Sequence, residues 1–296
     1  MSDSKAGQAA AAADRRYLPR SRREYSLGEA EFQELRQLIL KSTGISVDES
    51  KRLLVYRRLS GRLRALELEN FREYIDLLTL GDLQERQHFF NAVTTNKTAF
   101  FREKHHFDFL AATVLPALRK NQMARHRRLR IWSAGCSSGE EAHSIAMTLA
   151  EHIPDLAGWD AKILATDLDS AMIAAARRGI YTELDGRSLT SEQLRRFFKR
   201  NGDANDPMIK VSDELRAMTT FNQLNLINDW PMKGPFDVIF CRNVFIYFDK
   251  AVQEQLIDRF AKLLPNDGYL VLGHSETLRA PQRFKLVGKT IYRKVG

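Results

Sequence analysis

The stretch from Arg130 to Met147 holds the residues whose types and spacing best suit ligand chemistry. Gly135 and Gly139 bracket a short polar turn after a predicted strand, and Glu140 and Glu141 then open a predicted helix. Bare backbone at glycine lets a ligand approach closely, and the N-terminus of a helix offers free N–H groups. A strand that breaks on glycine into a helix start therefore predicts a dinucleotide-type binding loop.

Residues 135–139 also fit the G-x-S-x-G pattern of a serine hydrolase nucleophile elbow. Asp249 and His274 follow in an order that a catalytic triad permits. That elbow normally lies late in an α/β sheet, whereas everything before this strand has helical periodicity, so the strand would be the first of its sheet. The place of the loop in the chain therefore disfavours a hydrolase.

A nicotinamide site is a second alternative. Its G-x-G-x-x-G pattern needs a middle glycine to make room for a pyrophosphate, and Ser137 stands at that position. Asp167 follows the next apolar strand, 162–166, where an acid usually holds a nucleotide ribose. We therefore expect a ligand that carries a ribose but no phosphates.

The elements that position this loop alternate between strands and helices. Repeated strand–helix units followed by a hairpin predict a doubly wound α/β domain. After the loop, the expected elements are strand 162–166, helix 170–178, strand 220–226, strand 236–241, helix 251–264, strand 269–272 and a hairpin of 284–287 with 290–294. An insertion at about 180–219 interrupts them with a polar helix at 191–198, an Asn201-Gly202 hairpin turn and a strand at 209–211.

Residues 27–91 predict a small helical domain. Helices are expected after Ser26, after Asp48 and from Phe71 to Leu80. The second helix has an apolar stripe at helical spacing, formed by Val55, Leu59, Leu63 and Leu66. Its other faces have almost no acid between residues 51 and 64 and carry the arginines Arg57, Arg58, Arg62 and Arg64. Such a face usually contacts only solvent, but its charge density also suits docking of an acidic partner.

The composition limits the class of protein. A chain of 296 residues with 44% hydrophobic residues suggests two domains, and a formal net charge of +9 favours an acidic partner. Cys136 and Cys241 make neither a disulfide framework nor a zinc site, and no signal peptide or membrane-length apolar run is visible. We therefore expect a cytoplasmic protein without a metal, and residues 1–26 as a disordered basic leader.

The junction at 91–103 supplies polar side chains just before the glycine loop's domain, among them Asn96, Thr98 and Arg102. It is either a simple linker or a segment that lies over the ligand.

Several long motifs in this order resemble the chemotaxis receptor methyltransferases, the CheR family. They are NKTAFFRE at 96–103, WSAGCSSGEEAHSIA at 132–146, ATDLD at 165–169, FNQLNL at 221–226, FDVIFCRNVFIYFD at 236–249 and GHSE at 273–276. The departures are modest: Gly135 and Cys136 stand where alanines are common, and Ala142-His143 stands where Pro-Tyr is frequent.

The resemblance implies a small all-helical N-terminal domain (27–91) and a Rossmann-like S-adenosylmethionine-dependent methyltransferase domain (92–296) with an inserted antiparallel β-subdomain (about 180–219). It implies methyl transfer from S-adenosylmethionine, which leaves S-adenosylhomocysteine, to glutamates in the cytoplasmic helical bundle of chemoreceptors. In some members the β-subdomain binds a receptor's C-terminal peptide. A monomer is expected, with no nucleic-acid partner and no membrane insertion.

The same resemblance assigns site residues by motif. Ala134 and Glu140 would line the methionine and sulfonium end, Asp167 would hold the ribose, and Asn225 and Leu226 would flank the adenine. The pocket would be completed by Asn96, Thr98, Arg102, Arg242 and Asn243. Arg102 and Tyr247 would lie nearest the transferred methyl group and act in catalysis.

Two other classes remain as alternatives. Enzymes that methylate base amino groups usually carry an Asn/Asp-Pro-Pro-aromatic run after the fourth strand, and residues 241–244 at that place contain no proline. A non-catalytic binding module is disfavoured because Glu140, Asp167 and Arg102 are all retained.

Overall fold

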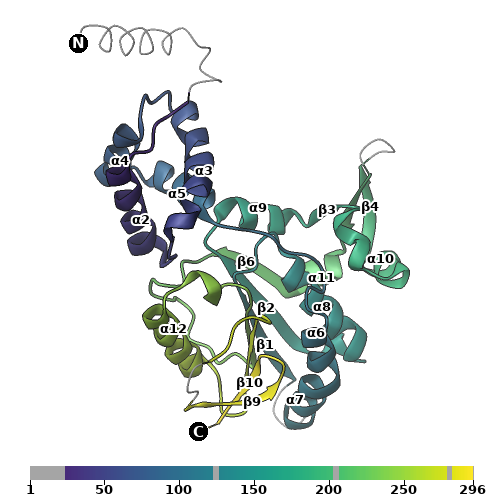
Figure 1. The fold of residues 1–296 in the computed structure, drawn as a ribbon. Helices are drawn as coiled ribbons and strands as arrows, with labels where there is room; N and C mark the ends of the chain where they lie inside the picture. The colour runs from purple at the N-terminus through teal and green to yellow at the C-terminus, as the bar shows by residue number, and fades with distance from the viewer. Residues whose placement is uncertain (1–23, 123–126, 203–206, 279–281, 296) are drawn as a thin grey trace, which may run out of the picture. The chain divides into compact units, whose positions relative to one another are not determined.

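The computed structural model describes residues 24–122, 127–202, 207–278 and 282–295 (Figure 1). The predicted leader, 1–26, lies almost entirely outside these residues. The chain forms two compact units: one holds the described residues up to Ser42 with Ser46–Val93, and the other holds Thr43–Ile45 with the described residues from Thr94 onward. Among the described helices, none combines the length and apolar character that a membrane crossing requires.

The first unit is helical, as the sequence predicts. Its elements are α2 (Glu29–Thr43), the short η2 (Glu49–Lys51), α3 (Arg52–Ala65), α4 (Phe71–Leu80) and α5 (Leu83–Val93). The apolar stripe of α3 enters the core through Val55, Leu59 and Leu63. Asn70 caps α4 by accepting a hydrogen bond from the backbone N–H of Glu73, and Gly81 ends the helix in the left-handed region.

The expectation of a nearly unopposed positive surface on α3 is wrong at Arg62. Its guanidinium binds the buried carboxylate of Glu85 on α5, with Nε at 3.0 Å from Oε1. The hydroxyl of the buried Tyr74 donates to the same Oε1 at 2.8 Å. Arg58 is half-buried, and its Nη1 donates to the carbonyl of Val93 at 2.9 Å. Only Arg57 and Arg64 of the four are exposed.

The second unit is built on a seven-stranded sheet in the order β6-β2-β1-β7-β8-β10-β9. The first five strands in that order run parallel: β6 (Thr219–Gln223), β2 (Asp160–Asp167), β1 (Arg128–Ala134), β7 (Val238–Cys241) and β8 (Tyr269–Leu272). The predicted terminal hairpin of β9 (Phe284–Gly288) and β10 (Ile291–Lys294) then pairs antiparallel. The glycine loop therefore follows β1, the middle one of the five parallel strands.

Both faces of this sheet are apolar and covered by helices. Successive strand residues point to opposite faces, so Ile131 joins one core cluster and Trp132 joins the other. Figure 1 shows α12 (Lys250–Leu263) on one side, and on the other side α6 (His105–Phe109), α7 (Leu115–Gln122) and α8 (Glu140–His152). Helix α9 (Ser170–Arg178) follows β2, with the predicted bounds.

The insertion forms a separate three-stranded antiparallel sheet, ordered β3 (Ile180–Thr182), β5 (Pro207–Val211) and β4 (Phe198–Gly202). It also carries α10 (Ser191–Phe197), and α11 (Asp213–Met218) leads back to the main sheet. Asn201 and Gly202 were expected to form the hairpin turn but belong to strand β4, where Gly202 pairs with Pro207. The connection between the two strands lies at 203–206, outside the described residues.

Helix α8 is buried from Glu140 to Ala150, and the side chain of His143 on this helix is fully buried. The imidazole meets the rings of Tyr181 and Phe221 at centroid distances of 6.1 and 5.4 Å. Burial lowers the pKa of His143 to about 3, because a charged imidazole would lose its hydration there.

This histidine should make the fold sensitive to acid. A depressed folded-state pKa means that the unfolded chain binds the proton first, so stability present above about pH 6.5 is lost as pH falls toward 3. Between pH 6.5 and 5 the loss should approach about 2 kcal/mol. His143→Phe should remove most of that loss in denaturant unfolding measured at pH 7.5 and 5.0. His152→Gln, an exposed change on the same helix, is the control, and equal acid sensitivity of His143→Phe and wild type would contradict this account.

Candidate ligand site at the carboxyl edge of the sheet

The glycine loop turns sharply between β1 and α8. Gly135 and Gly139 have φ angles of +86° and +100°, which side chains rarely allow, and a Cβ on Gly135 would meet Val244 at 2.3 Å. The backbone N–H groups of Gly135 and Cys136 both donate to the carbonyl of Thr166, at 2.7 and 2.9 Å. The loop is therefore fastened to the end of β2, with Ala134 buried on its strand side and Glu140 at the start of α8.

Asp167 lies beside this loop at the end of β2. Its Oδ2 accepts from the backbone N–H of Ser137 at 2.8 Å, and its Oδ1 accepts from the N–H of Asp169 at 2.9 Å. Burial raises the pKa of Asp167 to about 6, although these two hydrogen bonds favour the charged form. Each oxygen keeps further acceptor capacity, which suits a ligand that offers two hydroxyl groups.

The junction that precedes α6 is attached to the glycine loop. The carbonyl of Asn96 accepts from the Ser137 hydroxyl at 2.8 Å, and the Asn96 amide donates to Asp169 at 2.6 Å. Further along, the N–H of Phe101 donates to the hydroxyl of Ser144 on α8 at 2.9 Å. Thr98, between these attachments, is half-buried. The junction is thus not a free linker.

Arg242, at the end of β7, is the buried charge that joins three segments. Its Nη1 binds the carboxylate of Glu141 on α8 at 3.0 Å. Its Nη2 lies 3.3 Å from the carboxylate of Glu103 and also donates to the carbonyl of Arg102. The side chain of Arg242 is 2% exposed. Glu141 in turn accepts from the Ser133 hydroxyl on β1 at 2.7 Å. Nη1 and Nη2 of this guanidinium are therefore engaged by protein groups, whereas its buried Nε has no hydrogen-bond partner among the described residues. Its assignment to the ligand stays a prediction.

Glu103 was missed by the sequence analysis, although it closes the NKTAFFRE motif. Its carboxylate accepts from the side chain and the backbone N–H of His274, at 2.8 and 3.0 Å, and from the Asn243 amide at 3.2 Å. Burial alone would raise its pKa, but the hydrogen bond from His274 and the charge of Arg242 hold the pKa of Glu103 at about 2. These contacts fix Glu103 and thereby the backbone next to Arg102.

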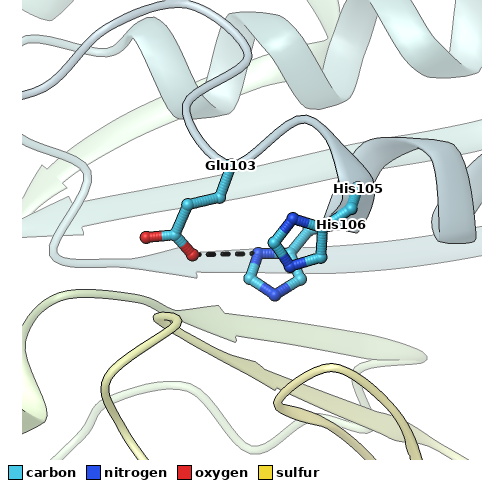
Figure 2. Close-up of side chains that lie close together, drawn as sticks. All are labelled: Glu103, His105 and His106. Atoms are coloured by element: carbon cyan, nitrogen blue, oxygen red, sulfur yellow. Dashed lines mark ion pairs between the residues drawn. The ribbon is translucent and has the colours of Figure 1, made fainter.

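Figure 2 shows Glu103 pointing toward His106, with His105 beside it. Ligand atoms of these three side chains lie within 4.8 Å of one another. Burial lowers the pKa of His106 to about 4, so its imidazole is neutral, and its Nε2 lies 3.0 Å from the carbonyl of Lys289. A divalent cation here would share the Glu103 carboxylate with the guanidinium of Arg242, which repels it. The cluster therefore fits an ion-pair network better than a metal centre.

Glu276, in the GHSE motif, is a second residue that sequence reasoning left without a role. It is buried and accepts from the backbone N–H groups of Gly273, Asn243 and Ile246, at 2.6, 2.9 and 3.2 Å. It thereby holds the loop that carries Asn243 and Tyr247. A short acid-containing motif after the last parallel strand was the available signal.

The remaining predicted residues lie on the same edge. Tyr247 ends the short η6 (Phe245–Tyr247) and is half-buried. Arg102 is half-buried, and its Nη1 donates to the carbonyl of Lys97 at 2.8 Å. Asn225 and Leu226 lie in the loop after β6, whose Leu224 N–H donates to the carbonyl of Asp167 at 2.9 Å. The arginines that the sequence analysis considers for docking, on α3, belong to the other unit.

Comparison with known proteins identifies both units. Residues 96–293 match the family described as CheR methyltransferase, SAM binding domain, and residues 30–94 match its all-alpha domain. The chain is similar to chemotaxis protein methyltransferase 2 of Pseudomonas aeruginosa, with 44% identity over 91% of this chain and 94% of the relative. It is also similar to the chemotaxis protein methyltransferases of Salmonella typhimurium and Escherichia coli, each with 42% identity over 90% of this chain and 91% of the relative.

Proposed function

This chain belongs to the CheR methyltransferase family, and we propose that it transfers methyl groups from S-adenosylmethionine to glutamate side chains of chemoreceptors. It is an S-adenosylmethionine-dependent methyltransferase with a helical N-terminal domain, as the sequence predicts. The arrangement that best supports the proposal is Asp167 hydrogen-bonded to Ser137 of the glycine loop. The remaining lone pairs of its carboxylate fit two ribose hydroxyls, and the loop lacks the middle glycine that would make room for a pyrophosphate.

The other contacts extend from this point. Ala134 and Glu140 would hold the methionine part, Asn225 and Leu226 would flank the adenine, and Asn96 and Thr98 would cover the ligand from the junction. Asn243, which Glu103 and Glu276 hold, and Arg242, which its ion pairs hold, would complete the pocket. Arg102 and Tyr247 are the proposed contacts of the reacting carboxylate.

The reaction requires little acid–base catalysis from these residues. A glutamate carboxylate has a reference pKa near 4.3, so it is already ionised at neutral pH and needs no general base. The sulfonium of the bound cofactor supplies the leaving group. The protein must orient the carboxylate in line with the methyl group and the sulfur and exclude water, and such positioning alone can supply several kcal/mol. Arg102 would orient the carboxylate, and Tyr247 would donate a hydrogen bond to it.

Labelled methyl transfer tests the function directly. Incubation with methyl-labelled S-adenosylmethionine and receptor-containing membranes should give alkali-labile methyl esters on the receptors. Parallel incubation with RNA should give no label, and transfer to RNA instead would contradict the proposal. Arg102→Ala should abolish most of the receptor signal while thermal unfolding shows little loss of stability, and near-normal turnover would remove Arg102 from the catalytic residues.

The pH dependence of cofactor binding tests Asp167. Because its pKa is raised to about 6, the ionised form that accepts ribose hydrogen bonds is present above that pH and lost below it. Calorimetry between pH 8 and 5 should therefore show affinity falling by up to about tenfold per pH unit below pH 6. Asp167→Asn should bind about 1.5–3 kcal/mol more weakly at pH 8 and lose this dependence. The same pH profile in both proteins would remove Asp167 from the ribose site.

The receptor-docking surface that we propose is the exposed side of α3. Arg57 and Arg64 lie there with the exposed Leu53 and Leu54, at 56% and 41% exposure. This mixed basic and apolar strip suits an acidic receptor helix. A receptor C-terminal peptide at β3 or β4, the edge strands of the β-subdomain, remains part of the proposal, as do the monomeric state and the cytoplasmic location.

Charge reversal on α3 should slow receptor methylation. Steering by complementary charge raises association rates by tenfold or more and is screened by salt. Arg57→Glu with Arg64→Glu should therefore lower the rate roughly tenfold at low ionic strength and less at high ionic strength, with cofactor affinity unchanged. Lys262→Glu with Lys285→Glu makes the same charge change at exposed positions of the other unit and should have little effect. If both pairs of substitutions slow methylation equally, the effect comes from net charge and not from a docking surface on α3.

A further inference from the structure

Residues 224–237 cross from β6 to β7 without a helix or a strand. Backbone groups in such a segment need partners outside regular structure. The segment begins at the proposed ribose site, because Leu224 is hydrogen-bonded to the backbone of Asp167. It then makes a tight turn, in which Asn225 accepts from the N–H of Ile227 at 3.2 Å through its side chain and from the N–H of Asn228 at 3.1 Å through its carbonyl.

One side chain from α12 holds this turn from outside. Nη1 of Arg259 donates to the carbonyl of Leu226 at 2.7 Å, and its Nη2 donates to the carbonyl of Asn228. Its guanidinium lies 3.8 Å from the ring centroid of Trp230. The indole Nε1 of Trp230 donates to the same Leu226 carbonyl at 3.1 Å. Two side chains thus converge on one peptide group.

Arg259 and Trp230 together form a clamp on this turn, and Trp230 is itself fixed by the core. Trp230 packs on the buried rings of Trp132 and Phe260, with centroids 4.9 and 5.1 Å apart. A planar guanidinium donates to the two carbonyls through separate nitrogens while its face lies on an aromatic ring, and the compact ammonium of lysine does not reproduce this geometry fully. The clamp thereby connects the rigid core of one sheet face to an irregular loop.

We propose that Arg259, with Trp230, is a positioning residue for the adenine end of the cofactor site. The inference rests on the proposed function, in which Asn225 and Leu226 flank the adenine. The clamp holds the turn in its binding shape before the ligand arrives, so the ligand does not have to order it. The adenosine part is the same in S-adenosylmethionine and S-adenosylhomocysteine, and it does not react. Loss of the clamp should therefore weaken both ligands equally and leave turnover at saturation unchanged.

Calorimetry and kinetics on Arg259→Gln, Arg259→Lys and Trp230→Phe test this, with Lys262→Gln as an exposed control on the same helix. For Arg259→Gln, Kd for both ligands and KM for S-adenosylmethionine should rise by roughly tenfold, with kcat unchanged. Arg259→Lys should recover part of the loss. Since Arg259 and Trp230 share the Leu226 carbonyl, Arg259→Lys with Trp230→Phe should cost less than the product of the single effects.

Unchanged Kd in folded Arg259→Gln would overturn the proposal, as would a fall in kcat at saturating cofactor without a change in Kd. If Arg259→Gln does not fold, Kd and kcat measured for Arg259→Lys and Trp230→Phe test the proposal instead. A wild-type protein that binds no S-adenosylmethionine would overturn the proposed function itself, and this result is distinct from a clamp that proves dispensable in an active enzyme.

Discussion

The methyltransferase unit depends on one buried guanidinium. Arg242 lies between Glu141 of α8 and Glu103 of the junction, and each of these carboxylates reaches a further segment. A charge buried to this degree is costly unless it is paired and hydrogen-bonded, and removal of one partner leaves the other charge uncompensated. The network therefore permits one arrangement of the junction, the start of α8 and the end of β7. Those segments carry several residues of the proposed cofactor site.

Backbone strain gathers at the same place. Four residues other than glycine with φ near +50° to +60° lie on the segments around this network, namely Phe101, Glu103, Ser137 and Asn243. Such conformations persist only where the surrounding structure over-determines them. Here each strained segment is tied by a buried or half-buried acid: Glu103 holds the junction, Asp167 holds Ser137, and Glu276 holds Asn243. These carboxylates thus mainly hold the backbone segments around the site in place.

The sequence predicts best what local patterns encode. Capping, periodicity and turn residues predict helices 71–80 and 170–178, strand 269–272 and the terminal hairpin. The two glycines of the glycine loop likewise predict its tight turn, since both have positive φ angles. Contacts between distant segments leave no such local trace. Nothing near Arg62 in the sequence indicates that Glu85, on another helix, neutralises it. Likewise, no local pattern shows that Arg259 holds residues 226 and 228.

The arginines show why net charge alone is a weak guide to a partner. The formal charge of +9 suggested an acidic surface or nucleic acid, yet several arginines serve the fold. Arg62 and Arg242 pair with buried carboxylates, and Arg177 and Arg259 donate to backbone carbonyls. Pairing leaves the total charge unaltered but fixes where positive potential can act. On α3 it concentrates that potential at Arg57 and Arg64, beside exposed leucines, so the surface that remains fits a protein helix better than a phosphate backbone.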